Sequence, residues 1–158
     1  PSRAATAATA APTDGPAGRQ GATVSAMCSV SVDGPAPCLL VCLHSGSRTA
    51  QAVAAIGAFC ANLLTEAQLA ISECFAGRDT APRETKFACA NWHQLRTGAP
   101  VLNGALAAFD CTVKDVRAVA SHQVFIGELQ DVECTGTGQP LVYQNRTYGR
   151  TQALGTHP

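Results

Sequence analysis

The second half of the chain consists of long apolar or alternating runs that turns interrupt. Residues 106–119, 122–134 and 141–143 are typical of strands, and Ala120-Ser121 and Asn145-Arg146 are two of the turns beside them. Successive strands that such short turns separate run antiparallel and form a meander. Together with two helices elsewhere in the chain, the pattern predicts a mainly β fold, a barrel with helical cover.

The first half adds three strands and a helix. Residues 22–32 alternate small polar and apolar side chains with a period of two, which predicts one strand that ends at the turn of residues 33–35. Residues 38–43 are apolar throughout, so we expect a strand that is covered on both faces. Residues 45–47 then offer a turn and a helix N-cap. An alanine-rich helix over residues 49–56, which ends at Gly57, and a strand over residues 59–64 follow.

A second helix is expected to begin at residues 65–68, where Thr-Glu-Ala-Gln is a capping box. Helical spacing predicts that one face of it packs on the protein, the face formed by Ala67, Ala70, Ile71, Cys74 and Phe75. Residues 78–100 then form a stretch longer than an ordinary connection. Its aromatic residues Phe87 and Trp92, together with Phe75, either cover a ligand as a lid or belong to the core.

The length of 158 residues suits one domain. Residues 1–21 are low in complexity and rich in Ala, Gly and Pro, so we expect an N-terminal tail or linker there. Residues 22–150 form the expected domain, and residues 151–158 form the expected C-terminal tail.

Charge and hydropathy exclude two classes of partner. The chain has 11 basic and 11 acidic side chains, so it lacks the positive surface that binds nucleic acid or an anionic membrane. No apolar run reaches the roughly 18 residues of a membrane-spanning helix. Because no signal segment is visible, we expect a cytoplasmic protein.

Eight cysteines raise the question of disulfides or a metal site. Most of them lie inside apolar runs, which favours free buried thiols at Cys38, Cys42, Cys60, Cys74, Cys89 and Cys111. There is no Cys-x-x-Cys pair, and the four histidines lack the spacing of zinc ligands, so we expect no metal. The P-loop lysine, the nucleophile elbow and the metalloprotease motif are also missing.

Two neighbouring segments form a candidate binding site. The small side chains of residues 22–32 would let a planar aromatic ligand lie against the strand and bond to its main chain. Ser45, Ser47, Arg48 and Thr49 supply hydroxyls, a cation and a helix start, which together suit a phosphate group. The alternative is structural, a serine-rich strand followed by a capped helix.

Six sequence blocks follow one another along the chain. They are TVSAMCSVS at 23–31, FCANLL at 59–64, FAGR at 75–78, TGAPVL at 97–102, HQVFIGEL at 122–129 and PLVY at 140–143. In this order they resemble the short-chain flavin reductases, the reductase components of two-component flavin-dependent monooxygenases. The resemblance covers residues 15–150, and the joint order of the blocks is more specific than any single block.

The resemblance implies a split β-barrel of the Greek-key, FMN-binding type, with two or three short helices, and a homodimer. It also implies an oxidoreductase that uses NADH or NADPH to reduce FMN or FAD and supplies the reduced flavin to a partner monooxygenase. Hydride transfer needs little acid–base machinery because the cofactors carry the reactivity, which agrees with the missing catalytic motifs.

The resemblance further implies which residues bind. The isoalloxazine ring would lie on Ser25, Ala26, Met27, Cys28 and Ser29, and Asn62 would touch the flavin from a neighbouring strand. The ribityl phosphate would be held by Ser45, Ser47 and Thr49. His122 would be the catalytic residue, which orients the nicotinamide carboxamide or relays a proton.

Several of these residues also have a structural interpretation. His122 suits a hydrogen-bonded histidine at a strand start, and Cys28 suits a small apolar filler as well as a redox group. Arg48 and Arg78 either bind phosphate or are solvated surface charges. No role is assigned to the other histidines, His44, His93 and His157.

The N-terminus departs from the family pattern. Family members ordinarily begin with a helix and a strand rich in Val and Thr, whereas residues 1–13 are alanine-rich with poor strand character. Without that strand, the edge beside residues 22–32 would stay unpaired. A second hypothesis is therefore a non-catalytic flavin-binding module, which would be a carrier, a sensor or a truncated inactive relative. A relative of the pyridoxamine-phosphate oxidases would need more phosphate-binding Arg and Lys residues than this lysine-poor chain offers.

Overall fold

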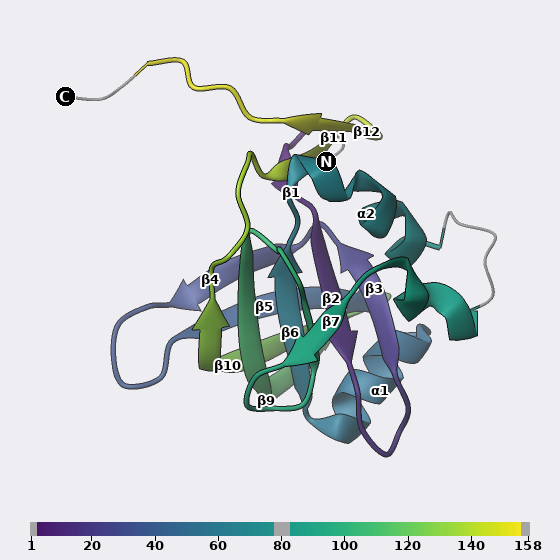
Figure 1. Cartoon of the computed structure of the whole chain (residues 1–158). Helices are drawn as coiled ribbons and strands as arrows, with labels where there is room; N and C mark the ends of the chain where they lie inside the picture. The colour runs from purple at the N-terminus through teal and green to yellow at the C-terminus, as the bar shows by residue number, and fades with distance from the viewer. Residues whose placement is uncertain (1–2, 78–82, 156–158) are drawn as a thin grey trace.

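The computed structural model describes residues 3–77 and 83–155, without the side chains of Arg83 and Glu84 (Figure 1). The strands are β1 (Thr6–Ala7), β2 (Thr9–Thr13), β3 (Gln20–Val24), β4 (Met27–Ser31), β5 (Cys38–His44), β6 (Ala58–Leu63), β7 (Trp92–Gln94), β8 (Pro100–Leu102), β9 (Ala107–Val119), β10 (His122–Glu133), β11 (Leu141–Gln144) and β12 (Thr147–Arg150). The helices are α1 (Arg48–Ile56) and α2 (Leu69–Phe75), with 3-10 turns η1 (Glu66–Gln68) and η2 (Arg83–Cys89). The predicted mainly β class is confirmed.

One seven-stranded antiparallel sheet carries the fold, in the order β3-β2-β6-β9-β10-β5-β4. The predicted meander is correct only for its first two strands, which form the long β9–β10 hairpin that turns at Ala120-Ser121. The third, β11, pairs with β1 and β12 in another sheet. A three-stranded sheet, β1-β11-β12, lies above it in Figure 1, and β7 and β8 form a separate pair.

The two edges of the large sheet are neighbours in the sequence. β3 is one edge and β4 is the other, yet only Ser25 and Ala26 separate them. The sheet therefore curls until its edges approach, and the Cys42 N–H donates to the Ala26 carbonyl at 3.1 Å. The prediction of one strand over residues 22–32 is wrong, because a period-two pattern does not show where a strand passes from one edge to the other.

Part of the expected N-terminal tail is a central strand. β2 is buried along its whole length, pairs with β3 on one side and β6 on the other, and the Thr13 hydroxyl donates to the Ala58 carbonyl at 2.7 Å. The expectation of a tail is wrong for these residues, and so is the expectation of an unpaired edge beside residue 22. Ala10 and Ala11 pack into cores on opposite faces of the strand, so small side chains, which leave no periodic pattern, fill both.

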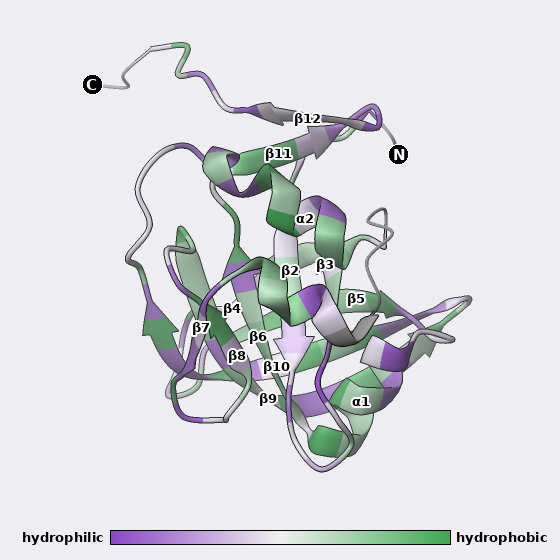
Figure 2. Ribbon diagram, turned by 45° about the vertical axis from the view of Figure 1, so that its right-hand side comes forward, coloured by the Kyte–Doolittle hydropathy of each residue, from purple (hydrophilic) through white to green (hydrophobic). Residues whose placement is uncertain are grey.

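The main core lies between the curled sheet and α1. Leu39, Val41 and Leu43 of β5 point into it, while Cys38, Leu40 and Cys42 on the other face are half-buried. The expectation that this strand is covered on both faces is therefore wrong for the single chain. Figure 2 shows hydrophobic residues along β5 and both hydrophobic and hydrophilic residues on α1.

The helix boundaries follow the predicted caps. The Ser47 hydroxyl accepts the Ala50 N–H at the start of α1, and Gly57, with φ of 79°, ends it in the left-handed conformation. The capping box at Thr65 is present, but it opens the η1 turn before α2 begins. The predicted packing face is only partly correct, because Ala67 and Ala70 are exposed.

The burial of the cysteines and the segment after α2 agree only in part with the predictions. Cys60, Cys74 and Cys111 are free and buried as expected, whereas Cys89 is exposed on η2. The long stretch after α2 contains η2 and β7 rather than only loop. Among the described residues, no helix is both long enough and apolar enough to span a membrane.

Candidate functional site

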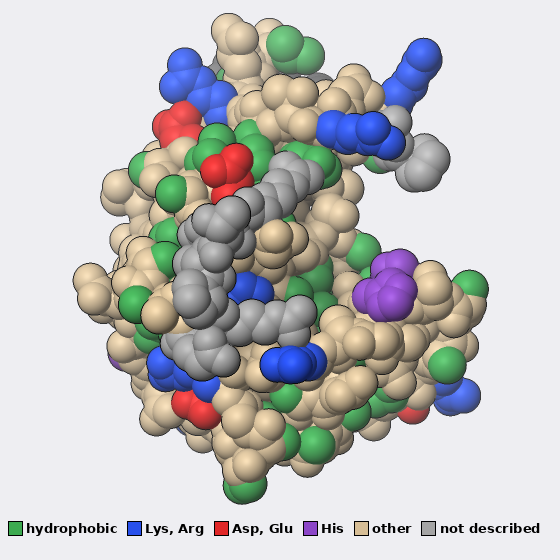
Figure 3. All heavy atoms as spheres, turned by 90° about the vertical axis from the view of Figure 1, so that its right-hand side faces the viewer, with side chains coloured by type: hydrophobic (Ala, Val, Ile, Leu, Met, Phe, Trp, Pro, Cys, Tyr) green, Lys and Arg blue, Asp and Glu red, His purple; other side chains and the backbone are tan. Residues whose placement is uncertain are grey.

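A cavity of about 500 Å³ opens between the start of α1, the end of α2 and the edge strand β3. Its volume lies within the range of sites that hold a cofactor-sized ligand. Figure 3 shows this face, with Lys and Arg side chains around a hollow and histidine side chains at one side of it. The lining comes from residues 19–22, 46–49 and 74–77 together with Lys86 and Phe87.

The cavity is built to receive an anion. The first turn of α1 lines it through Ser47, Arg48 and Thr49, and the free N–H groups of a helix start attract negative charge. Arg19 and Lys86 add two further cations. No acidic side chain lines the cavity in the part of the chain that the structure describes. A phosphate group fits these surroundings best.

Aromatic rings form one wall of the cavity. The Phe75, Phe87 and Trp92 rings pack with centroids 5.1–5.5 Å apart, and the Trp92 indole donates to the Phe87 carbonyl at 2.9 Å. The Lys86 ammonium lies 5.2 Å from the Phe75 ring and donates to the Gly21 carbonyl at 3.1 Å. Arg19 stacks over Phe87 at 4.7 Å. Phe75 is buried and lines the cavity together with Phe87, whereas Trp92 packs against both rings outside the cavity lining.

Two smaller hollows continue from the cavity toward the end of β3. The first, of about 130 Å³, shares Ala76 with the cavity and is lined by Ser25, Tyr143 and Tyr148 among others. The second, of about 380 Å³, shares Ser25 and Tyr143 with it and reaches Arg146. The shared residues place the three hollows next to one another, from the start of α1 to the β3–β4 junction, and together they are called the trough below.

The residues assigned to the isoalloxazine ring lie at this junction. Ser25 and Ala26 line the smaller hollows, while Met27 packs against the core beneath. Cys28 and Ser29 are exposed on β4, outside the lining of the three hollows. Cys28 pairs with Leu40 of β5 and lies diagonally across from Cys42, whose pKa is raised by burial and by the neighbouring Cys28 thiol.

The residues assigned to the phosphate are only partly brought together. Ser47 and Thr49 line the cavity, whereas Ser45 does not. The Ser45 N–H instead donates to the Ser121 carbonyl at 2.9 Å. Arg48 lines the cavity as well. Arg78 lies outside the described residues.

Asn62 lies away from the trough. Its side chain is fully buried in β6, donates to the Pro100 carbonyl at 3.2 Å and accepts the Leu102 N–H at 2.8 Å. Two longer contacts of 3.4 Å reach the carbonyls of Ala10 and Cys60. The geometry gives Asn62 the role of joining β2, β6 and β8.

His122 lies beside His44, a histidine that the sequence did not single out. The two residues stand at the ends of β5 and β10, and these strand ends are called the rim below. His122 and His44 are register partners on β10 and β5, and their rings meet edge to face with centroids 5.5 Å apart. Both are exposed, and the Gly46 N–H, from a residue that lines the cavity, donates to His44 Nδ1 at 3.1 Å.

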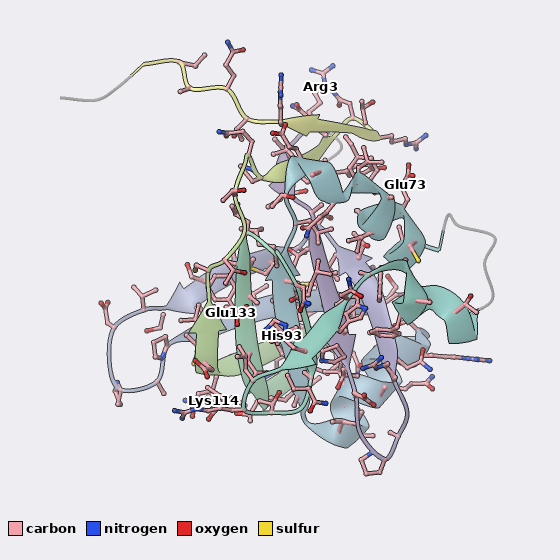
Figure 4. All side chains as sticks on the ribbon, in the orientation of Figure 1. Arg3, Glu73, His93, Lys114 and Glu133 are labelled. Atoms are coloured by element: carbon pink, nitrogen blue, oxygen red, sulfur yellow. The ribbon has the colours of Figure 1, made fainter. Side chains whose placement is uncertain are left out.

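A second polar cluster lies on β7 and β10. Figure 4 shows His93 and Glu133 side by side, and their Nε2 and Oε2 atoms are 3.0 Å apart. Asn103 contacts the other ring nitrogen. Burial lowers the pKa of His93, but the hydrogen bonds to Asn103 and Glu133 and the charge of Glu133 outweigh it, so the pKa is raised. Neither residue lines the trough. No group of three or more potential metal ligands occurs among the described residues.

Sequence reasoning did not assign three of the lining residues to the site: Lys86 lines the cavity, and Tyr143 and Tyr148 line the first smaller hollow. Lys86 is one of two lysines in the chain and precedes a phenylalanine, which is a usable signal in a long connecting segment. The two tyrosines face each other across the β11–β12 hairpin, with ring centroids 5.0 Å apart. Tyr143 belongs to the PLVY block, whereas nothing in its local sequence marks Tyr148.

Comparison with known proteins decides the family, because the model of the flavin reductase like domain matches residues 2–152. The chain belongs to this family. It is 44% identical over 146 residues to "FMN reductase (NADH) RutF" of Ancylobacter novellus, a match that covers 92% of this chain and 78% of that protein. It is 41% identical to "FMN reductase (NADH) RutF 1" of Methylorubrum extorquens, with 99% of this chain and 77% of that protein covered.

Solved structures of flavin reductase components have the same fold. Component B of a nitrilotriacetate monooxygenase from Mycobacterium thermoresistibile superposes with a TM-score of 0.87 at 28% identity, with 99% of this chain and 86% of that chain covered. BorF, the flavin reductase component of a bacterial two-component tryptophan halogenase, gives a TM-score of 0.85 at 29% identity, with 94% and 92% covered. The family resemblance inferred from the six sequence blocks is confirmed.

Proposed function

We propose that this protein is an NAD(P)H-dependent flavin reductase that supplies reduced FMN or FAD to a partner monooxygenase. The observation that carries the proposal is the trough. One end of it has the start of α1 and several cations, and the other end has the β3–β4 junction. The chain also belongs to the flavin reductase family. A flavin mononucleotide has a phosphate at one end and a tricyclic ring at the other, and this is the order of the features along the trough. The relatives named as NADH-dependent FMN reductases favour FMN and NADH.

Each part of the trough has a separate task under this proposal. Ser47, Thr49 and the start of α1 hold the phosphate, with Arg48 neutralising its charge. Ser25 and Ala26 present main-chain groups to the ring at the β3–β4 junction. His122 orients the nicotinamide at the rim. The flavin and the nicotinamide supply the hydride chemistry themselves, so the protein's work is alignment and exclusion of water.

We also propose that the curled sheet is a split barrel and that two chains associate. The approach of β3 and β4 through Ser25-Ala26 supports the barrel. Val30 and Val32, at the end of β4 that pairs with Cys38, are 51% and 72% exposed, and Cys38, Leu40 and Cys42 are half-buried on the outer face of β5. An apolar face of this kind suits a second copy of the chain, and sedimentation or light scattering at micromolar concentration measures it.

The test is oxidation of NADH followed at 340 nm, with and without added FMN or FAD. We expect flavin-dependent turnover, and Arg48→Gln to raise the KM for flavin about tenfold because one charge-assisted contact is lost. Lys114→Gln is the matched control, since Lys114 pairs with Glu128 at 3.1 Å outside the trough. Flavin binding without NADH oxidation would instead support the non-catalytic flavin-binding module.

A further inference from the structure

The ends of β5 and β10 form a rigid rim beside the cavity. His44 ends β5 and His122 begins β10, directly opposite each other. The Ser45 N–H donates to the Ser121 carbonyl at 2.9 Å, which joins the two chain segments that follow and precede the strands. Immediately after this contact the chain enters the cavity lining at Gly46. Side chains on this rim are therefore held in place next to the cavity lining at Gly46, although His44 and His122 do not themselves line the three hollows.

One hydrogen bond fixes the tautomer of His44. The Gly46 backbone N–H lies 3.1 Å from His44 Nδ1 and can only donate, so Nδ1 carries the lone pair that accepts it. In the neutral ring the proton then resides on Nε2. His44 thus presents an N–H donor whose direction is set by the turn at residues 44–46.

His122 is held in a similar way. Its Nδ1 lies 3.0 Å from the Ser121 hydroxyl, and its ring meets the His44 ring edge to face. Two imidazoles that are positioned by local contacts lose little freedom when a ligand binds, which favours an ordered polar contact at this point. His122 already has a place at the nicotinamide end of the trough under the proposed function.

We infer that His44 is a binding residue for the nicotinamide nucleotide, to which its Nε2–H donates a hydrogen bond beside His122. The inference rests on the proposed function. The cations of the cavity, Arg19, Arg48 and Lys86, lie where the flavin phosphate is expected, so the hydride donor approaches from the rim. A nicotinamide nucleotide carries carboxamide, hydroxyl and phosphate oxygens, all of which accept hydrogen bonds. A donor with a fixed direction at the rim suits them.

Three substitutions of His44 separate this role from a structural one. Asparagine places an acceptor oxygen near the position of Nδ1 and keeps the contact with the Gly46 N–H, whereas glutamine places an N–H donor near the position of Nε2. Alanine removes both. We expect His44→Ala and His44→Asn to raise the KM for NADH about tenfold with little change in kcat, and His44→Gln to stay within about threefold of the wild type. His93→Gln, at a residue outside the lining of the three hollows, is the control.

Direct binding of NADH, measured by fluorescence titration without flavin turnover, gives the second readout. We expect the dissociation constants to follow the same order as the KM values while the flavin dissociation constant stays unchanged. Rescue by asparagine instead of glutamine would show that His44 only supports the turn and would overturn the inference. An unchanged KM and an unchanged NADH dissociation constant in His44→Ala would overturn it as well. Wild-type protein that binds NADH through His44 but never oxidises it would contradict the proposed function alone.

Discussion

The replacement of Asn62 by alanine decides between two roles for this residue. In the structure its side chain accepts the buried Leu102 N–H and donates to the buried Pro100 carbonyl, so Asn62→Ala leaves both main-chain groups without these partners. An orphaned buried polar group costs about 1–3 kcal/mol, so the two together should lower the free energy of unfolding by about 2–6 kcal/mol. For a chain of this length that corresponds to a fall in Tm of about 4–24 °C.

The assay is urea unfolding followed by circular dichroism, together with flavin titration under native conditions. We expect the dissociation constant for FMN to change less than about twofold in the folded fraction, because Asn62 lies outside the trough lining. Asn91→Ala, at an exposed position, serves as the control and should change stability by less than about 0.5 kcal/mol. The reasoning is refuted if Asn62→Ala unfolds like the wild type but binds FMN at least tenfold more weakly, since that is the behaviour of a flavin contact.

Three further predictions follow from contacts described above. Because the pKa of His93 is raised, its contact with Glu133 contributes its full stability below the unfolded pKa of 6.5, and this stability is lost as the pH rises through the folded pKa. The difference in urea midpoint between wild type and Glu133→Gln should therefore shrink between about pH 6 and pH 8.5. A constant difference would contradict this. A thiol reagent at about pH 8 should modify the exposed Cys28, Cys89 and Cys134 first. Cys111 should react only in denaturant, because burial and the charge of Asp110 raise its pKa to about 12. Mass spectrometry of the labelled peptides measures the order. A methyl group at Gly21 would lie 2.6 Å from the Phe75 ring and push it toward the cavity, so Gly21→Ala should weaken FMN binding about tenfold, whereas Gly149→Ala, with nothing within 4 Å of the added carbon, should bind FMN normally.

Local signals in the sequence predicted local structure well. Ser47, Gly57 and the capping box at Thr65 each act through hydrogen bonds or a φ angle within a few residues, and all three are found at the expected positions. The long strands β9 and β10 were also predicted within about two residues, because their apolar pattern and the turn between them are both local.

Features that depend on distant parts of the chain were missed. β2 is buried on both faces by alanines, so no hydrophobic period marks it as a strand. The break at Ser25-Ala26 follows from the curling of the whole sheet, and the burial of Asn62 follows from β8, 38 residues further along the chain. His44 lies beside His122 only because β10 pairs with β5, and no local signal in the sequence shows this pairing.

The central position of β2 has a consequence for how the protein reaches this fold. β2 pairs with β3, formed by residues 20–24, but also with β6, formed by residues 58–63, and β6 in turn pairs with β9. During synthesis β2 can therefore complete its pairing only after β6, which leaves the ribosome much later, has been made. Pairing across such sequence separations slows folding to the millisecond-to-second range, and until it is complete the alanine-rich segment is open to proteases and to other chains.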